Sequence, residues 1–108
     1  MPGIATSVLD PPPAFAQEVD ISDDTLAVHL TDGRSILVPL AWYPRLFHAT
    51  RAERDNWRLI GQGQGIHWPD VDEDISVAAL LAGRCSHESV ESFGRWLTER
   101  NSGLGSHA

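Results

Sequence analysis

The sequence has no lysine, a single cysteine (Cys85) and no long run of apolar residues. A membrane-spanning helix needs roughly 20 apolar residues in succession, so none is expected. A lone cysteine cannot form a disulfide within the chain, which favours a reducing, cytoplasmic location. The first residues also lack a basic segment followed by an apolar stretch, so no secretory signal is expected.

The chain is poor in basic residues. Its 8 bases, all arginine, stand against 15 acidic residues, and the formal net charge is −7. Because neutralisation of phosphates by Lys and Arg supplies much of the affinity for nucleic acids, autonomous nucleic-acid binding is not expected. A basic protein surface is a suitable partner instead. The acidity can also serve solubility alone, and composition does not separate these alternatives.

Length and apolar content favour one folded domain. The chain has 108 residues, of which 42% are hydrophobic, enough for a single core. Three consecutive prolines at 11–13 fit neither a helix nor a central strand, so residues 1–14 are predicted to be a disordered tail. The domain is expected over residues 15–100, and residues 101–108 are predicted to be a flexible tail.

Alternating apolar residues predict an antiparallel meander of three strands: 15–21, 25–30 and 35–40. The pair Asp32-Gly33 favours a two-residue type I′ turn, which would place Val28 opposite Leu37. Helical patterns follow the meander. The expected fold is therefore α+β, with a three- to four-stranded antiparallel meander and two to four short helices packed on one side.

A capping box predicts the start of one helix. Thr50 and Glu53 have the spacing at which each side chain accepts a hydrogen bond from the other residue's amide, and the helix is expected to run to about residue 58. Arg51, Arg54 and Arg58 recur at helical spacing within it and predict a basic stripe. Such a stripe is either a solvated face paired with neighbouring acids or a contact for an anion or a partner.

Two further helices are expected near the end of the chain. Asp74 is a candidate N-cap for a mostly buried helix over residues 75–82, with Gly83 as its C′ residue. Ser86 is expected to cap the last helix, which has an apolar stripe.

The segment 63–74, GQGIHWPDVDED, concentrates polar side chains that could bind a ligand. The candidate ligand or interaction residues in it are His67, Trp68, Asp70 and Asp72. The alternate acids resemble a calcium loop, but Ile75 and Leu81 stand where that loop needs Gly and Glu. A looser oxygen site stays open. Since no nucleophile–base pair, zinc set or dinucleotide fingerprint is found, no catalytic residue, metal site or cofactor is predicted.

Several separated motifs occur in an order that resembles one family. They are the Asp32-Gly33 hairpin, VPLAWYPRL (38–46), ATRAERDNW (49–57), GIHWPDVDEDISV (65–77) and LLAG (80–83). The order resembles that of the mainly bacterial domain of unknown function 2442 (DUF2442), over about residues 18–83. SHESVESFGRWLTER, which follows, is similar to the C-terminal helix of many members. The resemblance implies a small α+β fold and no established catalytic residues.

The same resemblance implies a kind of partner. Genes of the family often lie beside those of another small family thought to act as toxins, which implies an antitoxin-like role. The first hypothesis is therefore a non-enzymatic protein-interaction module, antitoxin-like or a regulatory subunit, that binds a basic partner protein. The second is a small-ligand or metal-binding domain centred on residues 67–74. Self-association through an exposed edge strand is a further prediction.

Overall fold

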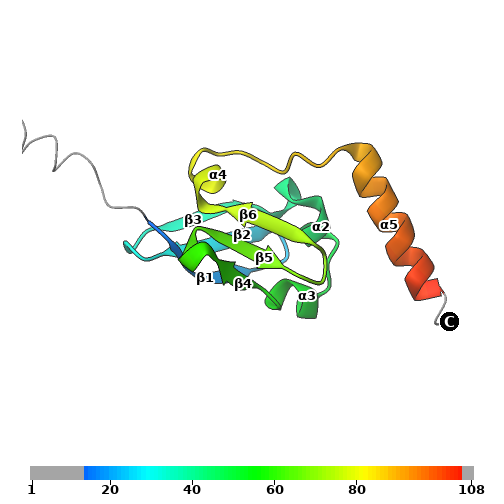
Figure 1. Cartoon of the computed structure of the whole chain (residues 1–108), viewed down its shortest axis with the longest axis horizontal. Helices are drawn as coiled ribbons and strands as arrows, with labels where there is room; N and C mark the ends of the chain where they lie inside the picture. Colours follow the sequence, from blue (N-terminus) through cyan, green and yellow to red (C-terminus); the bar gives the residue numbers. More distant parts are fainter. Residues whose placement is uncertain (1–13, 106–108) are drawn as a thin grey trace, which may run out of the picture.

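The computed structural model describes residues 14–105, which include two antiparallel sheets (Figure 1). The buried side chains of both sheets share one core. The first sheet has the order β1-β2-β3, with strands Ala16–Ile21, Thr25–Leu30 and Ser35–Pro39. The second has the order β4-β5-β6, with strands Arg58–Ile60, Gly65–Trp68 and Glu73–Ser76. The helical elements are η1 (Leu40–Trp42), α2 (Pro44–Phe47), α3 (Arg51–Asp55), η2 (Gly61–Gly63), α4 (Val77–Leu81) and α5 (Val90–Gly105). The predicted α+β class is confirmed.

The predicted meander forms the first sheet, with its apolar side chains alternating into the core. The predicted pairing of β2 with β3 is wrong by one residue, because Val28 lies opposite Ile36 instead of Leu37. A shift of one residue exchanges the two faces of a strand. Val38 is accordingly buried, whereas the Leu37 side chain is 65% exposed.

The hairpin turn accounts for that shift. The amide of Leu30 donates to the carbonyl of Arg34 (2.8 Å), and the amide of Gly33 donates to the carbonyl of Leu30 (3.2 Å). Three residues therefore form the loop, and Gly33 has a φ of +93°, which suits glycine. The Asp32 carboxylate accepts a hydrogen bond from the Arg34 amide (3.0 Å). Asp32 and Gly33 do form the turn, but the predicted type I′ geometry is wrong.

The second sheet replaces part of a predicted helix. Asp74 does not cap a helix: it lies in β6, opposite His67 in β5. Ser76 caps α4 instead, and its side-chain oxygen accepts a hydrogen bond from the Ala79 amide (3.0 Å). Pairing of β6 with β5 buries apolar residues from both strands, which outweighs a local capping signal worth about 1 kcal/mol. Gly83 follows the C-cap with a φ of +71°, so its predicted C′ position is confirmed.

Trp68 is the largest fully buried side chain of the core. Its indole N–H donates to the carbonyl of Arg54 at 3.0 Å, so the one polar atom of the ring is satisfied. It shares the core with residues from both sheets and from α2, among them Leu26, Leu46 and Ile66. Trp68 was a candidate ligand or interaction residue, but its fully buried side chain offers no surface to a partner.

The capping box at the start of α3 is confirmed. The side-chain hydroxyl of Thr50 accepts from the Glu53 amide (3.1 Å), and a carboxylate oxygen of Glu53 accepts from the Thr50 amide (2.8 Å). The helix ends at Asp55, earlier than expected, because β4 begins at Arg58 and pairs with β5.

Helix α5 lies at one end of the molecule, beyond a long connection from α4 (Figure 1). Ser86 does not cap it: its first turn is capped by Ser89, whose side-chain oxygen accepts from the Ser92 amide (3.0 Å). The helix runs through Gly105, inside the predicted tail; residues 1–13 and 106–108 of the predicted tails lie outside the described part. Neither α5 nor any other helix among residues 14–105 is both long and apolar enough to cross a membrane.

Candidate functional site

A cleft of about 580 Å³ lies between strand β6 and the connection from α4 to α5. Four carboxylates line it, and one of them, Asp72, was a candidate ligand residue in the sequence: Asp72, Glu73, Asp74 and Glu88. Arg45 and Arg84 are the arginines of the lining, and Ile60 adds apolar surface. A concave site with convergent charged groups is the usual form of a binding site. This one favours positive charge because its acids outnumber its bases.

Glu73 has the most perturbed carboxyl of the cleft. Burial raises the pKa of its side chain to about 7, and the negative charge of Glu88 adds to the rise. Arg45 opposes it, but that guanidinium is committed to Glu88, with Nη2 and Oε2 2.6 Å apart. Among the ion pairs of the described residues, none includes Glu73. Glu73 therefore changes its charge near neutral pH, in a cleft that opens to solvent.

The wall beside Glu73 is held by fixed hydrogen bonds. Arg45 donates through Nε and Nη2 to the Glu88 carboxylate and through Nη1 to the Val71 carbonyl (3.1 Å). Because of Arg45, the pKa of Glu88 is lowered below its ordinary value. The Tyr43 hydroxyl donates to the Arg84 carbonyl (3.1 Å), and burial raises the pKa of Tyr43 to about 12, so this donor stays neutral.

The polar side chains of segment 63–74, which was predicted as a site, have different partners in the structure. His67 and Asp74 form a cross-strand pair, with 2.5 Å between Nδ1 and Oδ1. Asp70 accepts a hydrogen bond from the side-chain amide of Asn56 (2.9 Å). Asp72 lies in the β5–β6 turn with a φ of +52°. Of the candidate residues in this segment only Asp72 lines the cleft, together with Asp74, which was predicted as an N-cap.

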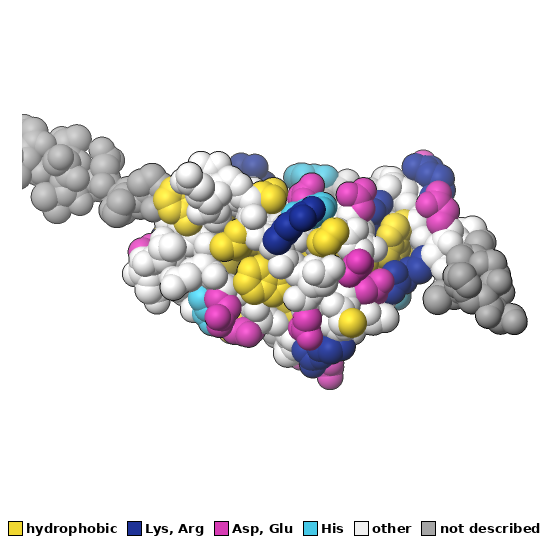
Figure 2. All heavy atoms as spheres, turned by 60° about the horizontal axis from the view of Figure 1, so that its bottom comes forward, with side chains coloured by type: hydrophobic (Ala, Val, Ile, Leu, Met, Phe, Trp, Pro, Cys, Tyr) yellow, Lys and Arg dark blue, Asp and Glu magenta, His cyan; other side chains and the backbone are white. Residues whose placement is uncertain are grey.

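The predicted basic stripe does not form. Arg51 donates to the carbonyl of Ile21 (2.8 Å), and Arg54 donates to two carbonyls at the end of α2. Arg58 lies in β4 and not in the helix. On the face in Figure 2 the arginine side chains stand apart from one another among acidic and hydrophobic groups. The interpretation of Arg51, Arg54 and Arg58 as one helical stripe is therefore wrong. Arg51 and Arg54 instead donate hydrogen bonds to backbone carbonyls of β1 and α2.

Sequence patterns alone did not identify the central residues of the cleft. Glu73 stands in the acidic run, but nothing in that run distinguishes it from its neighbours. Arg45 and Glu88 are 43 positions apart, so no local spacing signals their pairing. The raised pKa of Glu73 arises from folding, because burial is its largest cause.

The raised pKa of Glu73 predicts that the free energy of unfolding depends on pH. Below pH 4.5, the ordinary pKa of a glutamate, the Glu73 carboxyl is protonated in both the folded and the unfolded state. Between pH 4.5 and 7 the unfolded chain loses this proton while the folded protein still holds it, so the folded state binds more protons. The free energy of unfolding therefore contains a contribution that falls over this range. Glu73→Gln should remove it and raise the free energy of unfolding at pH 8 by about 1–2 kcal/mol, with allowance for partial exposure.

Urea denaturation at pH 5 and pH 8 measures this effect. Glu91→Gln removes an exposed carboxyl from α5 and is the matched control, which should change both values little. An equal pH dependence in wild type and Glu73→Gln would contradict the assignment.

Comparisons with other proteins identify the family. A family model described as "Protein of unknown function (DUF2442)" matches residues 16–86. The crystal structure of a protein of unknown function from Rhodospirillum rubrum ATCC 11170 is similar, with a TM-score of 0.61 and 26% identity over 71% of this chain and 95% of that chain. An uncharacterised protein from Chromobacterium violaceum, 17% identical, shares the fold with a TM-score of 0.58 over 91% of this chain and 83% of its own. No curated protein matches. The chain belongs to the DUF2442 family, as the order of its motifs predicts.

Proposed function

We propose that this domain is a non-enzymatic protein-interaction module whose acidic cleft receives a lysine or arginine side chain of a basic partner protein. The observation that carries the proposal is the Glu73 carboxyl, partly buried in the cleft between Asp72 and Asp74 and outside any ion pair of the described residues. Because no cation of the described residues pairs with this carboxyl, a cation of another molecule that binds beside it would stabilise its ionised form.

The arrangement of the cleft suits a long basic side chain. A guanidinium or ammonium beside Glu73 would favour its ionised form, so binding near neutral pH would release a proton. Exposed apolar surface on Ile60, which is 42% exposed, could contact the methylene stem of the same side chain. Glu88 is already satisfied by Arg45 and therefore leaves the incoming charge to Glu73.

The charge of the whole chain supports a basic partner. A net charge of −7 attracts a positively charged protein over several ångströms and speeds the encounter. The gene neighbourhood implied by the resemblance makes the product of an adjacent, toxin-like gene the first partner to test. Binding would then have an antitoxin-like or regulatory role.

Co-expression with the adjacent gene product, followed by size-exclusion chromatography and calorimetry, tests the proposal. Wild type should co-elute with the partner, and Glu73→Gln combined with Asp74→Asn should weaken binding by at least about tenfold, the effect of losing roughly 1.4 kcal/mol of charge pairing. Calorimetry at pH 7 in buffers of different ionisation enthalpy should detect proton release in wild type only.

Glu91→Gln combined with Glu99→Gln is the control for overall charge, because it also removes two acidic groups and both residues are exposed on α5. Separate peaks at concentrations of about 10 μM, or equal binding by the cleft variant, would contradict the proposal. The elution volume of the domain alone also tests the predicted self-association, for which the edge strands β1, β3, β4 and β6 are the candidates.

A second candidate is a small organic cation, and the volume of the cleft favours it. At about 580 Å³ the cleft lies within the range of small-molecule sites. Spermidine is a suitable probe because its amines match the acidic lining. A rise in melting temperature with spermidine that disappears in Glu73→Gln would support this function, and no change at about 10 mM would count against it.

A further inference from the structure

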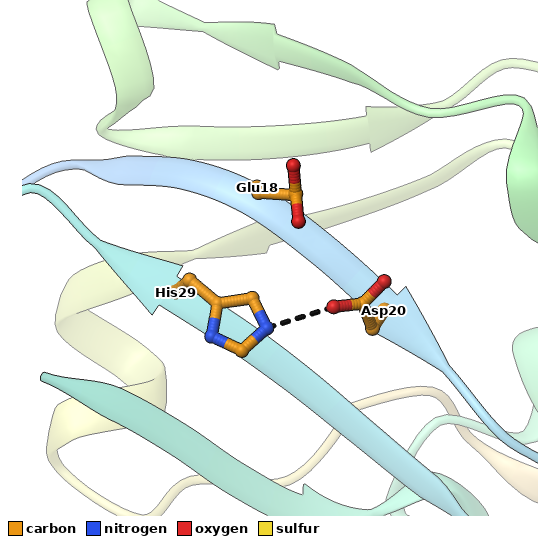
Figure 3. Close-up of side chains that lie close together, drawn as sticks. All are labelled: Glu18, Asp20 and His29. Atoms are coloured by element: carbon orange, nitrogen blue, oxygen red, sulfur yellow. Dashed lines mark hydrogen bonds and ion pairs between the residues drawn. The ribbon is translucent and has the colours of Figure 1, made fainter.

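Three potential metal ligands lie together on the outer face of the first sheet, away from the cleft residues. They are Glu18 and Asp20 in β1 and His29 in β2, and Figure 3 shows the three side chains turned toward one another. One ligand atom of each lies within 4.8 Å of the other two, and His29 Nε2 is 2.8 Å from an Asp20 oxygen. They are the only such group of three or more His, Cys, Asp or Glu among residues 14–101.

An irregularity in β1 brings Glu18 into this group. Ala16 lies opposite Leu30 and Glu18 lies opposite His29, so β1 has one extra residue, Gln17, at this point. Ala16 is buried, and strict alternation from it would direct Glu18 into the core. The bulge turns Glu18 outward instead, on the same side as Asp20 and beside the histidine.

The histidine ring is oriented by a fourth residue. Nδ1 of His29 is 2.7 Å from the hydroxyl oxygen of Ser35 in β3, while Nε2 faces the carboxylates. When Nδ1 carries the proton and donates it to Ser35, Nε2 has a free lone pair directed at Asp20. A hydrogen bond to the second ring nitrogen is the usual means of fixing a metal-binding histidine.

We propose that Glu18, Asp20 and His29 bind a divalent transition-metal ion of the zinc class, with water completing its coordination. One imidazole nitrogen with carboxylate oxygens suits Zn²⁺, whereas Ca²⁺ and Mg²⁺ are bound by oxygen. Ligand atoms of a tetrahedral zinc site lie roughly 3.3 Å apart, which rotations of the two exposed carboxylates can reach. Two carboxylates also neutralise the charge of the ion. This site is independent of the proposed partner-binding cleft.

The alternative is a cross-strand pair of His29 with Asp20 that binds no metal. The same chain contains a matched example of such a pair, because His67 and Asp74 also face each other across two antiparallel strands. That pair has no third metal ligand within reach among the described residues. His67→Gln is therefore the control that separates a metal site from a histidine–aspartate pair.

Calorimetric titration of the tag-free, chelator-treated chain with ZnCl₂ tests the inference, alongside ¹⁵N spectra of the histidine rings. Wild type should bind one ion at the triad, with a change at Nε2 of His29. His29→Gln and Asp20→Asn should each weaken binding by at least about tenfold, and Ser35→Ala by about tenfold through loss of ring orientation. His67→Gln should bind as wild type does.

Asp20 and Ser35 are exposed and the two histidines are half-buried, outside the buried core, so the variants should fold, which circular dichroism checks. No binding by wild type at about 1 mM Zn²⁺ would overturn the inference. Equal affinity of wild type and His29→Gln would also overturn it, because the ion would then be bound elsewhere in the chain.

Discussion

Replacing Trp68 by alanine should lower the free energy of unfolding by about 3–5 kcal/mol, a large part of the roughly 5–15 kcal/mol that stabilises a typical domain. The indole is fully buried and lies in the core that joins the two sheets. Its removal leaves a cavity that the surrounding β-structure can fill only in part. The Arg54 carbonyl also loses the indole N–H that satisfies it at 3.0 Å.

Two further variants separate the apolar and polar parts of this effect. Trp68→Phe keeps most of the ring volume and loses the hydrogen bond, so it should cost about 1–3 kcal/mol. Trp57→Ala removes a partly buried tryptophan at the edge of the core and should cost less than Trp68→Ala. Urea denaturation followed by circular dichroism measures all three. A loss below about 1 kcal/mol for Trp68→Ala would contradict the central position assigned to Trp68.

Features whose signals come from near neighbours in the chain could be predicted from the sequence. Strands β1 and β2, the turn at Asp32-Gly33 and the capping box at Thr50 were predicted because their signals lie within a few residues of one another. Each depends on side-chain alternation or on a hydrogen bond between near neighbours. These local signals did not predict the geometry of the turn. The loop has three residues instead of two, which shifts β3 by one position relative to β2 and exposes Leu37.

Features that depend on distant contacts could not be read from the sequence. Asp74 has the local signal of an N-cap, but pairing with His67 places it in a strand. The cleft requires Glu88 to meet Arg45 across 43 positions, and its chemistry follows from the burial of Glu73. In the proposed metal site, a bulge brings together residues whose spacing in the sequence matches no motif.

Helix α5 is attached by charged groups as much as by apolar ones. Glu88, just before the helix, pairs with Arg45, and Arg100 within it pairs with Glu53. The guanidinium groups of Arg45 and Arg100 both lie over the ring of Trp96, 5.5 Å and 5.1 Å from its centre. The side chains of Arg45 and Glu88 are 17% and 9% exposed, so their pair should contribute more than a surface ion pair.

Arg45→Met should lower the free energy of unfolding by about 2–3 kcal/mol, between the values for surface and buried pairs. The variant leaves the Glu88 carboxylate without its cation, near the carboxyl of Glu73. Glu88→Gln should cost less, because it removes a charge that opposes Glu73 and frees Arg45 to approach it. A double-mutant cycle in urea at pH 7 should give a coupling energy of about 1–2 kcal/mol.

The ion pairs Arg45–Glu88 and Arg100–Glu53 predict that acid releases α5 before the sheets unfold. Arg45 lowers the pKa of Glu88, and Arg100 lowers that of Glu53, so both contributions are present above the ordinary value of 4.5 and disappear as the pH falls through the lowered values. Hydrogen exchange should then show early loss of protection in α5 while β2 and β5 stay protected.

Arg95→Met, at an exposed position of α5, is the matched control for Arg45→Met. If Arg45→Met costs no more than Arg95→Met, the attachment of α5 rests on Trp96 and its apolar neighbours instead.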